Sequence, residues 1–219
     1  MERAYGLEIP QSLEEVCDPR RLALVVYDMQ VGVLNQLERA AEVTERVVEV
    51  LQAARDGGFR VVFLRHMSLP RELMGVFQFR MAMAWQRTDK VDDVQPWFLR
   101  DAPGFELTPE VAPRSSEAVL DKITMSAFEG TPLDIVLRDC GLVAFAIVGV
   151  ATEIGIEPTV RHGADLGYIP VVVTDACGAG HEEAAKRSID GLAFSGDALL
   201  TDTATFTALL RRHRPTGES

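Results

Sequence analysis

The stretch AFAIVGVATEIG, residues 144–155, joins an uninterrupted apolar run to a turn and to the start of a helical pattern. An apolar run of this length predicts a strand that is buried on both faces. The helical pattern continues to residue 166, so the strand turns directly into a helix whose first free amides lie above the sheet. A cysteine at position 155 would be activated there by the helix dipole, but the chain has Gly155. A site at this turn therefore works without a sulfur nucleophile or does no chemistry.

The same alternation of apolar runs and amphipathic stretches extends in both directions from this turn. We predict strands at 22–27, 60–64, 118–123, 144–150, 169–174 and 198–201. We predict helices at 37–54, 132–140, 154–166, 181–192 and 204–212, and a frayed tail at 214–219. Strands separated by helices imply crossover connections and parallel pairing. The fold class that follows is α/β, a three-layer α-β-α sandwich around a six-stranded, mostly parallel sheet.

Length and composition fit one globular α/β domain spanning residues 1–219. The formal net charge of −11 argues against nucleic acid or an anionic membrane as a partner. The N-terminus has no apolar signal region, and no apolar run approaches membrane-spanning length, so we expect a cytoplasmic protein. Three widely spaced cysteines suggest neither a disulfide framework nor a metal site, which agrees with a reducing compartment.

Residues 68–116 interrupt the alternation of strands and helices. Prolines divide this insert, which also carries the aromatic residues Phe77, Phe79, Trp85, Trp97, Phe98 and Phe105. A long connection inside a compact domain often covers a pocket. Packing against a neighbouring subunit is the alternative, because a large apolar surface is poorly tolerated in water.

Two charged residues lie where the carboxyl ends of parallel strands form a ligand-binding edge. Asp28 follows the first predicted strand, and its role is either that of a general acid or base or that of a cap on the following turn. Lys122 lies inside an apolar strand, where a lysine needs a partner. We expect that partner to be Asp28 rather than Asp121, because consecutive strand residues point to opposite faces. A purely structural ion pair is the alternative to a catalytic one.

Three segments together resemble the isochorismatase-like hydrolase family, within the cysteine hydrolase superfamily. They are 24–30 (LVVYDMQ), 121–128 (DKITMSAF) and 149–165, and the likeness extends over residues 20 to 205. The family carries an Asp-Lys-Cys triad, and the resemblance gives Asp28 and Lys122 the first two places. The family's Gly-x-x-Thr-x-x-Cys turn reads GVATEIG here, so Gly155 stands in place of the nucleophilic cysteine.

The resemblance implies two kinds of chemistry. The family's amidases need a thiolate, whereas its isochorismatases proper resemble this chain in having glycine at that position. In those enzymes an acidic aspartate protonates a vinyl ether, and water captures the resulting cation. By this likeness Asp28 is the proton donor, Lys122 tunes it and contacts a substrate carboxylate, and the amides of 153–155 bind an anion or the reacting water. Gly155 would then leave room for a cyclic substrate.

We also predict a set of substrate-binding residues from the resemblance and from their place in the insert. The polar insert residues Gln78, Arg80 and Arg87 are either carboxylate ligands or solvated surface groups, since arginine clamps carboxylates with two hydrogen bonds. The predicted substrate contacts are Gln30, Gln78, Trp85, Arg87, Val150, Ala151, Thr152, Ile154 and Gly155. The residues after Trp85 and Val150 depart from the isochorismatase pattern, which leaves the substrate open.

No cofactor and no metal are predicted, because the segment LRHMS at 64–68 lacks the ligand pair of the family's metal-binding branch. Cys177 follows a strand at the ligand-binding edge, and it is either a substitute nucleophile or a small buried side chain. Partners are limited to a small molecule and further copies of the chain, since the resemblance implies homodimers or homotetramers.

The sequence leaves three candidate functions. The first is a hydrolase that cleaves a small carboxylated substrate by Asp-driven acid catalysis, as in vinyl ether hydrolysis. The second is an amide or carbamoyl hydrolase that uses activated water, which Gly155→Cys would improve. The third is a ligand-binding relic without turnover.

Overall fold

The computed structural model describes residues 1–214, so of the tail predicted to fray only Arg214 lies within the described part of the chain. Six strands form one sheet in the order β5-β4-β3-β6-β7-β8, and every pairing in it is parallel. The strands are β3 (Leu22–Tyr27), β4 (Arg60–His66), β5 (Ala118–Lys122), β6 (Ala144–Val150), β7 (Ile169–Gly178) and β8 (Leu199–Thr201). The predicted sheet is therefore confirmed.

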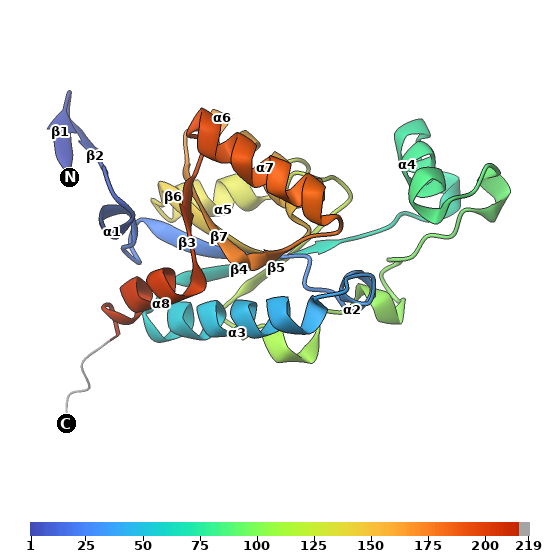
Figure 1. Ribbon diagram of the computed structural model, residues 1–219, viewed down its shortest axis with the longest axis horizontal. Coiled ribbons are helices and arrows are strands. Elements are labelled where there is room, and N and C mark those ends of the chain that lie inside the picture. Colours follow the sequence, from blue (N-terminus) through green and yellow to red (C-terminus); the bar gives the residue numbers. More distant parts are fainter. Residues whose placement is uncertain (215–219) are drawn as a thin grey trace.

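Helices cover both faces of this sheet, which gives the predicted three layers (Figure 1). On one face lie α3 (Ala40–Asp56) and α8 (Thr203–Arg211), which pack into the first apolar core. On the other lie α5 (Leu133–Asp139), α6 (Glu157–Asp165) and α7 (Glu182–Ser195), which form the second core. The confirmed α/β sandwich thus buries its sheet from both sides.

Strand β3 contributes side chains to both apolar cores. All of its residues are buried, and they alternate between the two faces as a strand requires. Leu24 and Val26 belong to the core beneath α3, whereas Val25 and Tyr27 belong to the core beneath α5 to α7. Tyr27, the last residue of β3, is therefore directed into the layer that contains the turn after β6.

The order of the strands places a crevice at the carboxyl ends of β3 and β6. From β3 the chain moves outward through β4 and β5, and it then returns to β6 on the other side of β3 before continuing to β7 and β8. Adjacent strands whose connections leave in opposite directions form a switch point, where open parallel sheets bind ligands. Asp28 and the turn after Val150 both lie at this switch point.

Several local features differ from the sequence-based expectation. An N-terminal hairpin of β1 (Glu2–Ala4) and β2 (Leu7–Ile9) was not predicted, nor were the short helices α1 (Leu13–Val16) and α2 (Val31–Leu34). The helix expected at 154–166 begins instead as a π-helical turn, Thr152–Ile156, before α6. Strand β7 continues to Gly178, with a shift of register against β6.

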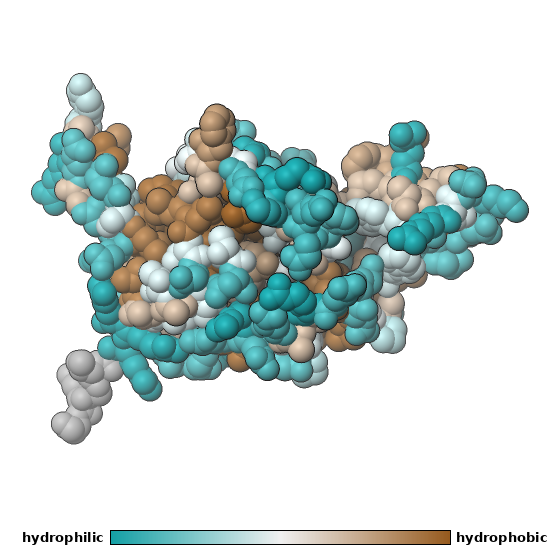
Figure 2. Space-filling view, in the orientation of Figure 1, coloured by the Kyte–Doolittle hydropathy of each residue, from teal (hydrophilic) through white to brown (hydrophobic). Residues whose placement is uncertain are grey.

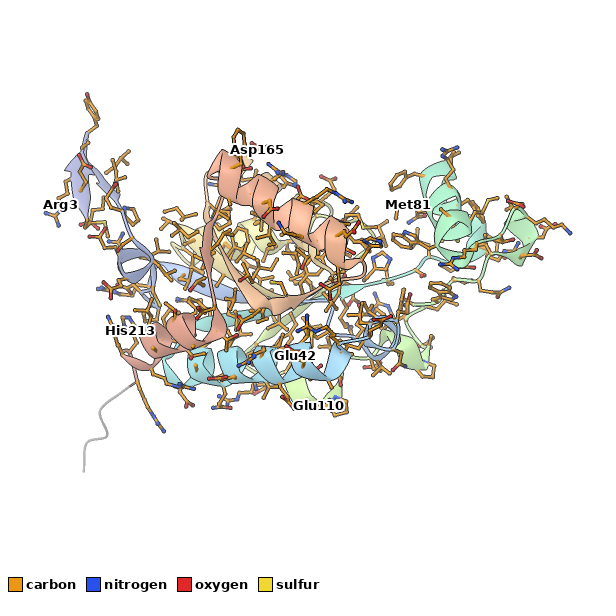
Figure 3. All side chains as sticks on the ribbon, viewed as in Figure 1. Arg3, Glu42, Met81, Glu110, Asp165 and His213 are labelled. Atoms are coloured by element: carbon orange, nitrogen blue, oxygen red, sulfur yellow. The ribbon has the colours of Figure 1, made fainter. Side chains whose placement is uncertain are left out.

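The insert at 68–116 contains one helix, α4 (Val76–Gln86), and four 3-10 turns at Arg71–Leu73, Val91–Asp93, Pro103–Phe105 and Pro109–Val111. Figure 1 shows α4 standing away from the helical layers as an arm. Figure 3, in which Met81 marks α4, shows the side chains that this arm carries at the edge of the sandwich. None of the α4 residues is buried.

Within residues 1–214 no helix is both long enough and apolar enough to cross a membrane.

Candidate active site

Asp28 and Lys122 meet across the edge of the sheet. Lys122 ends β5 and Asp28 follows β3, with β4 between them. The Lys122 Nζ atom donates a hydrogen bond of 2.7 Å to Asp28 Oδ2, and both side chains are almost completely buried. The expected pairing of these residues is thus present in the structure. Asp121, the alternative partner, binds Arg65 and Arg100 on the other face.

The backbone at Asp28 is held in an unusual conformation. Its φ angle is +47°, in the left-handed region that residues other than glycine seldom adopt. The surrounding main chain fixes it, because the Asp28 amide donates to the Leu64 carbonyl at 3.1 Å and the Gln30 amide donates to the Asp28 carbonyl at 2.7 Å. Conformations of this kind are retained mostly at functional sites.

Burial changes the acidity of the pair. It raises the pKa of Asp28 to about 6, and the nearby Lys122 ammonium only partly opposes this rise. Burial also lowers the pKa of Lys122, while Asp28 opposes that change. One carboxylate oxygen, Asp28 Oδ1, has no hydrogen-bond partner among the described residues. A buried carboxyl with a free oxygen and a pKa near neutrality is suited to proton transfer.

Asp28 and Lys122 line a cavity of about 140 Å³ at the switch point. Its wall is mostly apolar and aromatic. Of the predicted substrate contacts, Trp85, Val150, Ala151, Ile154 and Gly155 belong to it. The further lining residues are Tyr27, Val33, Gln36, His66, Trp97, Phe98 and Met125. The insert contributes Trp85, Trp97 and Phe98, so this segment does form part of the pocket wall.

His66 is a cavity residue that the sequence analysis considered only as an absent metal ligand. It ends β4, between the strands that carry Asp28 and Lys122. Burial, and next the charge of Lys122, lowers the pKa of His66 to about 3, so the imidazole is neutral near pH 7. Its place at the end of a central strand was the signal that could have identified it.

Two of the three amides that were expected to bind an anion after β6 are already engaged within the turn. The amides of Ile154, Gly155 and Ile156 all donate to the Ala151 carbonyl, at 3.3, 3.0 and 3.2 Å. This convergence belongs to the π-helical first turn. We predicted that the amides of 153–155 bind an anion or the reacting water. For residues 154 and 155 this prediction is corrected, because their hydrogens already have an acceptor.

Four predicted substrate contacts lie outside the cavity. Gln30 is fully buried, and its carboxamide binds the main chain of His66 and Phe105. Thr152 donates to the Gly178 carbonyl at 3.0 Å. Gln78 caps α4 and lines a smaller neighbouring cavity of about 70 Å³. Arg87 is exposed at the end of α4.

The cysteines are separated from the Asp28 cavity. Cys177 lies on β7 and lines a different cavity, of about 420 Å³, and its thiol donates to the Ile147 carbonyl at 3.5 Å. Burial raises the pKa of the Cys177 thiol strongly, which disfavours a thiolate. Among residues 1–214 no group of three or more His, Cys, Asp or Glu side chains is arranged to hold a metal ion.

An open parallel sheet with an acid–base pair in a cavity at its switch point is the arrangement of an α/β enzyme. The model of the isochorismatase domain matches residues 22–205, and the chain belongs to the isochorismatase family. Homologues in this family are hydrolases, amidohydrolases among them, which confirms the predicted hydrolase class.

Individual relatives show the same likeness. The ureidoacrylate amidohydrolase RutB of Acinetobacter baylyi is 29% identical over 174 residues, covering 73% of this chain and 71% of that protein. A cysteine hydrolase from Pseudomonas syringae pv. phaseolicola superposes with a TM-score of 0.76 at 25% identity, over 90% of this chain and 95% of that one. The N-carbamoylsarcosine amidase of Thermoplasma acidophilum has a TM-score of 0.68 at 23% identity, over 84% and 96%, which supports the fold.

Proposed function

We propose that this protein is a thiol-independent hydrolase in which Asp28 acts as a general acid on the enol ether of a small carboxylated substrate. One observation carries the proposal. Asp28 Oδ2 is paired with Lys122, while Oδ1 has no partner among the described residues and the carboxyl lines a cavity that has no cysteine in its wall. A carboxyl group with a pKa raised to about 6 keeps its proton at pH values where an ordinary carboxyl group has lost it.

The proposed reaction needs no covalent enzyme intermediate. The Asp28 carboxyl donates its proton to the terminal vinyl carbon, and the carbon that bears the ether oxygen becomes an oxocarbenium ion. Water adds to this carbon and loses a proton to the Asp28 carboxylate. The hemiketal then breaks its bond to the leaving group and becomes a ketone, and the proton lost by its hydroxyl ends on the oxygen of the leaving alcohol. Asp28 ends in its starting state, as a general acid requires.

Lys122 has two roles in this proposal. Its ammonium opposes the effect of burial on Asp28 and so keeps that carboxyl acidic enough to donate. It also supplies the positive charge that attracts the substrate carboxylate into a cavity with otherwise apolar walls. The rings of Trp85, Trp97 and Phe98 suit a flat, cyclic substrate, because aromatic walls bury such rings well.

The turn after β6 favours acid catalysis over amide hydrolysis. Hydrolysis of an amide passes through a tetrahedral oxyanion that needs preorganised donors. The amides of Ile154 and Gly155 are already bound to the Ala151 carbonyl. Protonation of an enol ether forms a cation, and this step makes no demand on those amides.

Amide or carbamoyl hydrolysis by activated water is the second candidate. The likeness to a ureidoacrylate amidohydrolase, at 29% identity over most of both chains, favours it. In that reaction Asp28 would act as a base and take a proton from water.

A substrate panel separates these candidates. Enolpyruvyl ethers of cyclic carboxylic acids are assayed for pyruvate, and carbamoyl compounds for ammonia, with wild type and Asp28→Asn. We expect pyruvate release that Asp28→Asn strongly reduces. Ammonia release would replace the first proposal with the second. Thermal stabilisation by a panel compound without turnover, equal in both proteins, would indicate a ligand-binding relic.

We also propose that the insert joins two copies of the chain while it forms the cavity wall. The outer surface of α4 and its flanks is apolar, with Leu73 and Phe77 both 67% exposed and Val76 81% exposed. On the face that Figure 2 shows, the arm carries moderately hydrophobic residues beside hydrophilic ones. Light scattering should give a mass of at least twice 24.1 kDa, and Phe77→Glu should reduce it to that of one chain. A wild-type mass of one chain would refute the proposal.

A further inference from the structure

The position of a side chain at residue 155 is already filled. A Cβ atom built on Gly155 would lie 2.1 Å from the Tyr27 hydroxyl oxygen, 2.5 Å from Cζ and 2.6 Å from Cε1. These separations are far below the contact distance of carbon and oxygen atoms, so both residues cannot keep their positions if 155 carries a side chain. The obstacle is an aromatic ring and not the flexible end of a long chain.

Tyr27 has little freedom to move aside. It is 1% exposed and belongs to the core beneath α5 to α7. Its hydroxyl donates to the Met125 carbonyl, and the Lys122 ammonium lies 4.3 Å from the centre of its ring. The ring is therefore held between the Gly155 backbone on one side and the catalytic ion pair on the other.

We propose that Tyr27 is the residue that determines which kind of nucleophile this site can use. Its ring occupies the volume that a nucleophilic side chain at position 155 needs, so Tyr27 and Gly155 form one steric unit. This inference deepens the proposed function, because it explains why the cavity is free of thiol. It also corrects two expectations: the space beside Gly155 holds Tyr27 rather than a cyclic substrate, and Gly155→Cys alone cannot install a thiol there.

A double-mutant cycle of thermal stability tests the steric unit of Tyr27 and Gly155 without any substrate, so its result is independent of the proposed reaction. The variants are Gly155→Cys, Tyr27→Val and the pair combined, with thermal unfolding as the measurement. We expect Gly155→Cys to lower Tm by roughly 5–10 °C beside Tyr27 and by less than about 2 °C in the Tyr27→Val background. Equal losses in the two backgrounds, or no loss beside Tyr27, would overturn the proposal.

Tyr27→Phe provides a graded comparison. It removes the hydroxyl but leaves Cζ at 2.5 Å from the added Cβ, so it should relieve little of the loss. Where Gly155→Cys yields no folded protein, recovery of folded protein by adding Tyr27→Val supports the proposal. Tyr27→Leu is the second background, because it keeps more core volume. Failure to recover folded protein in both backgrounds refutes it.

Gly163 supplies the matched control. A Cβ there would lie 2.5 Å from Phe145 Cε1, so Gly163→Ala is crowded to a similar degree by a different ring. Gly163→Ala should lower Tm by the same amount with and without Tyr27→Val. A smaller loss in the Tyr27→Val background would show that Tyr27→Val relieves crowding throughout the core, and it would overturn the specific pairing of Tyr27 with Gly155.

In the folded Tyr27→Val, Gly155→Cys variant, native iodoacetamide treatment should add one label more than in Tyr27→Val. Absence of that label would overturn the proposal, because a side chain at position 155 would then not reach the cavity.

Discussion

Asp121 and Lys122 are consecutive residues of β5, yet their side chains bind groups on opposite faces of the sheet. Asp121 accepts a hydrogen bond of 2.8 Å from Arg65 Nε, whereas Lys122 donates one of 2.7 Å to Asp28. This division follows from the alternation of side chains along a strand. Asp121 is thus a paired carboxylate that is adjacent to Lys122 in sequence but lies outside the cavity, and it serves as a control.

Asp28→Asn should reduce kcat by about 10²–10⁴ while substrate still binds, because the amide keeps the shape of the carboxyl but has no acidic proton to transfer. Steady-state kinetics gives the rate, and ligand-induced stabilisation gives the binding. Asp121→Asn should leave kcat within about twofold of wild type. Similar losses in the two variants would mean that a carboxylate outside the cavity matters as much as Asp28.

The pH dependence of kcat/KM should be that of an enzyme whose catalytic carboxyl group must be protonated. The active form of Asp28 is protonated, and its pKa is about 6, so activity should be level below that pH and fall about tenfold per unit above it. His66, with a pKa of about 3, stays neutral throughout this range and adds no second limb. A rate that rises through pH 6 would show that Asp28 works as a base.

Lys122→Met should move the falling limb to higher pH. The ammonium lowers the pKa of Asp28, so its removal leaves burial unopposed and the carboxyl less acidic. We expect kcat/KM to fall by roughly 10², with an increased KM for a carboxylated substrate. Lys122→Arg, which keeps the charge, should return the limb toward its wild-type position. An unshifted limb in Lys122→Met would contradict the assigned role of Lys122.

Gln30→Ala should destabilise the fold rather than weaken substrate binding. The Gln30 carboxamide satisfies the His66 amide, the His66 carbonyl and the Phe105 carbonyl. Their loss should cost roughly 3 kcal/mol, or about 10 °C in Tm. Gln36→Ala, at an exposed position, should change stability by less than about 0.5 kcal/mol. An unchanged Tm with a raised KM would restore Gln30 to the substrate contacts.

Alkylating reagents should leave activity unchanged. Burial raises the pKa of Cys17 to about 12 and that of Cys177 further, so neither forms a reactive thiolate under native conditions. Treatment with iodoacetamide followed by assay measures this, and Cys177→Ala should keep kcat/KM within about twofold. Inactivation that tracks labelling of Cys177 would bring a thiol back into the mechanism.

The fold and the central ion pair could be predicted because each depends on a short-range pattern. The run at 144–150 is apolar throughout, as a strand with two covered faces must be. Lys122 is a buried lysine in a mostly apolar stretch and needs a partner, and Asp28 lies at the same edge of the sheet. Both arguments use only strand geometry and the cost of burying charge.

The rest of the site depends on contacts between residues that are distant in sequence. Gln30 binds main-chain groups that are 36 and 75 residues away in the sequence. The sequence alone does not distinguish such a structural glutamine from one that contacts a ligand. The π-helical turn redirects the amides after Ala151, and no periodicity distinguishes it from an α-helix. The apolar residues of α4 are spread around the helix and none of its residues is buried, so its pattern gave no face to assign.

The two tryptophans of the chain, Trp85 and Trp97, both line the Asp28 cavity, and both are partly exposed to solvent. Intrinsic tryptophan fluorescence therefore originates wholly at the proposed binding site. A compound that displaces water from these indole rings will change the emission spectrum, so candidate substrates can be ranked by titration before any reaction is detected.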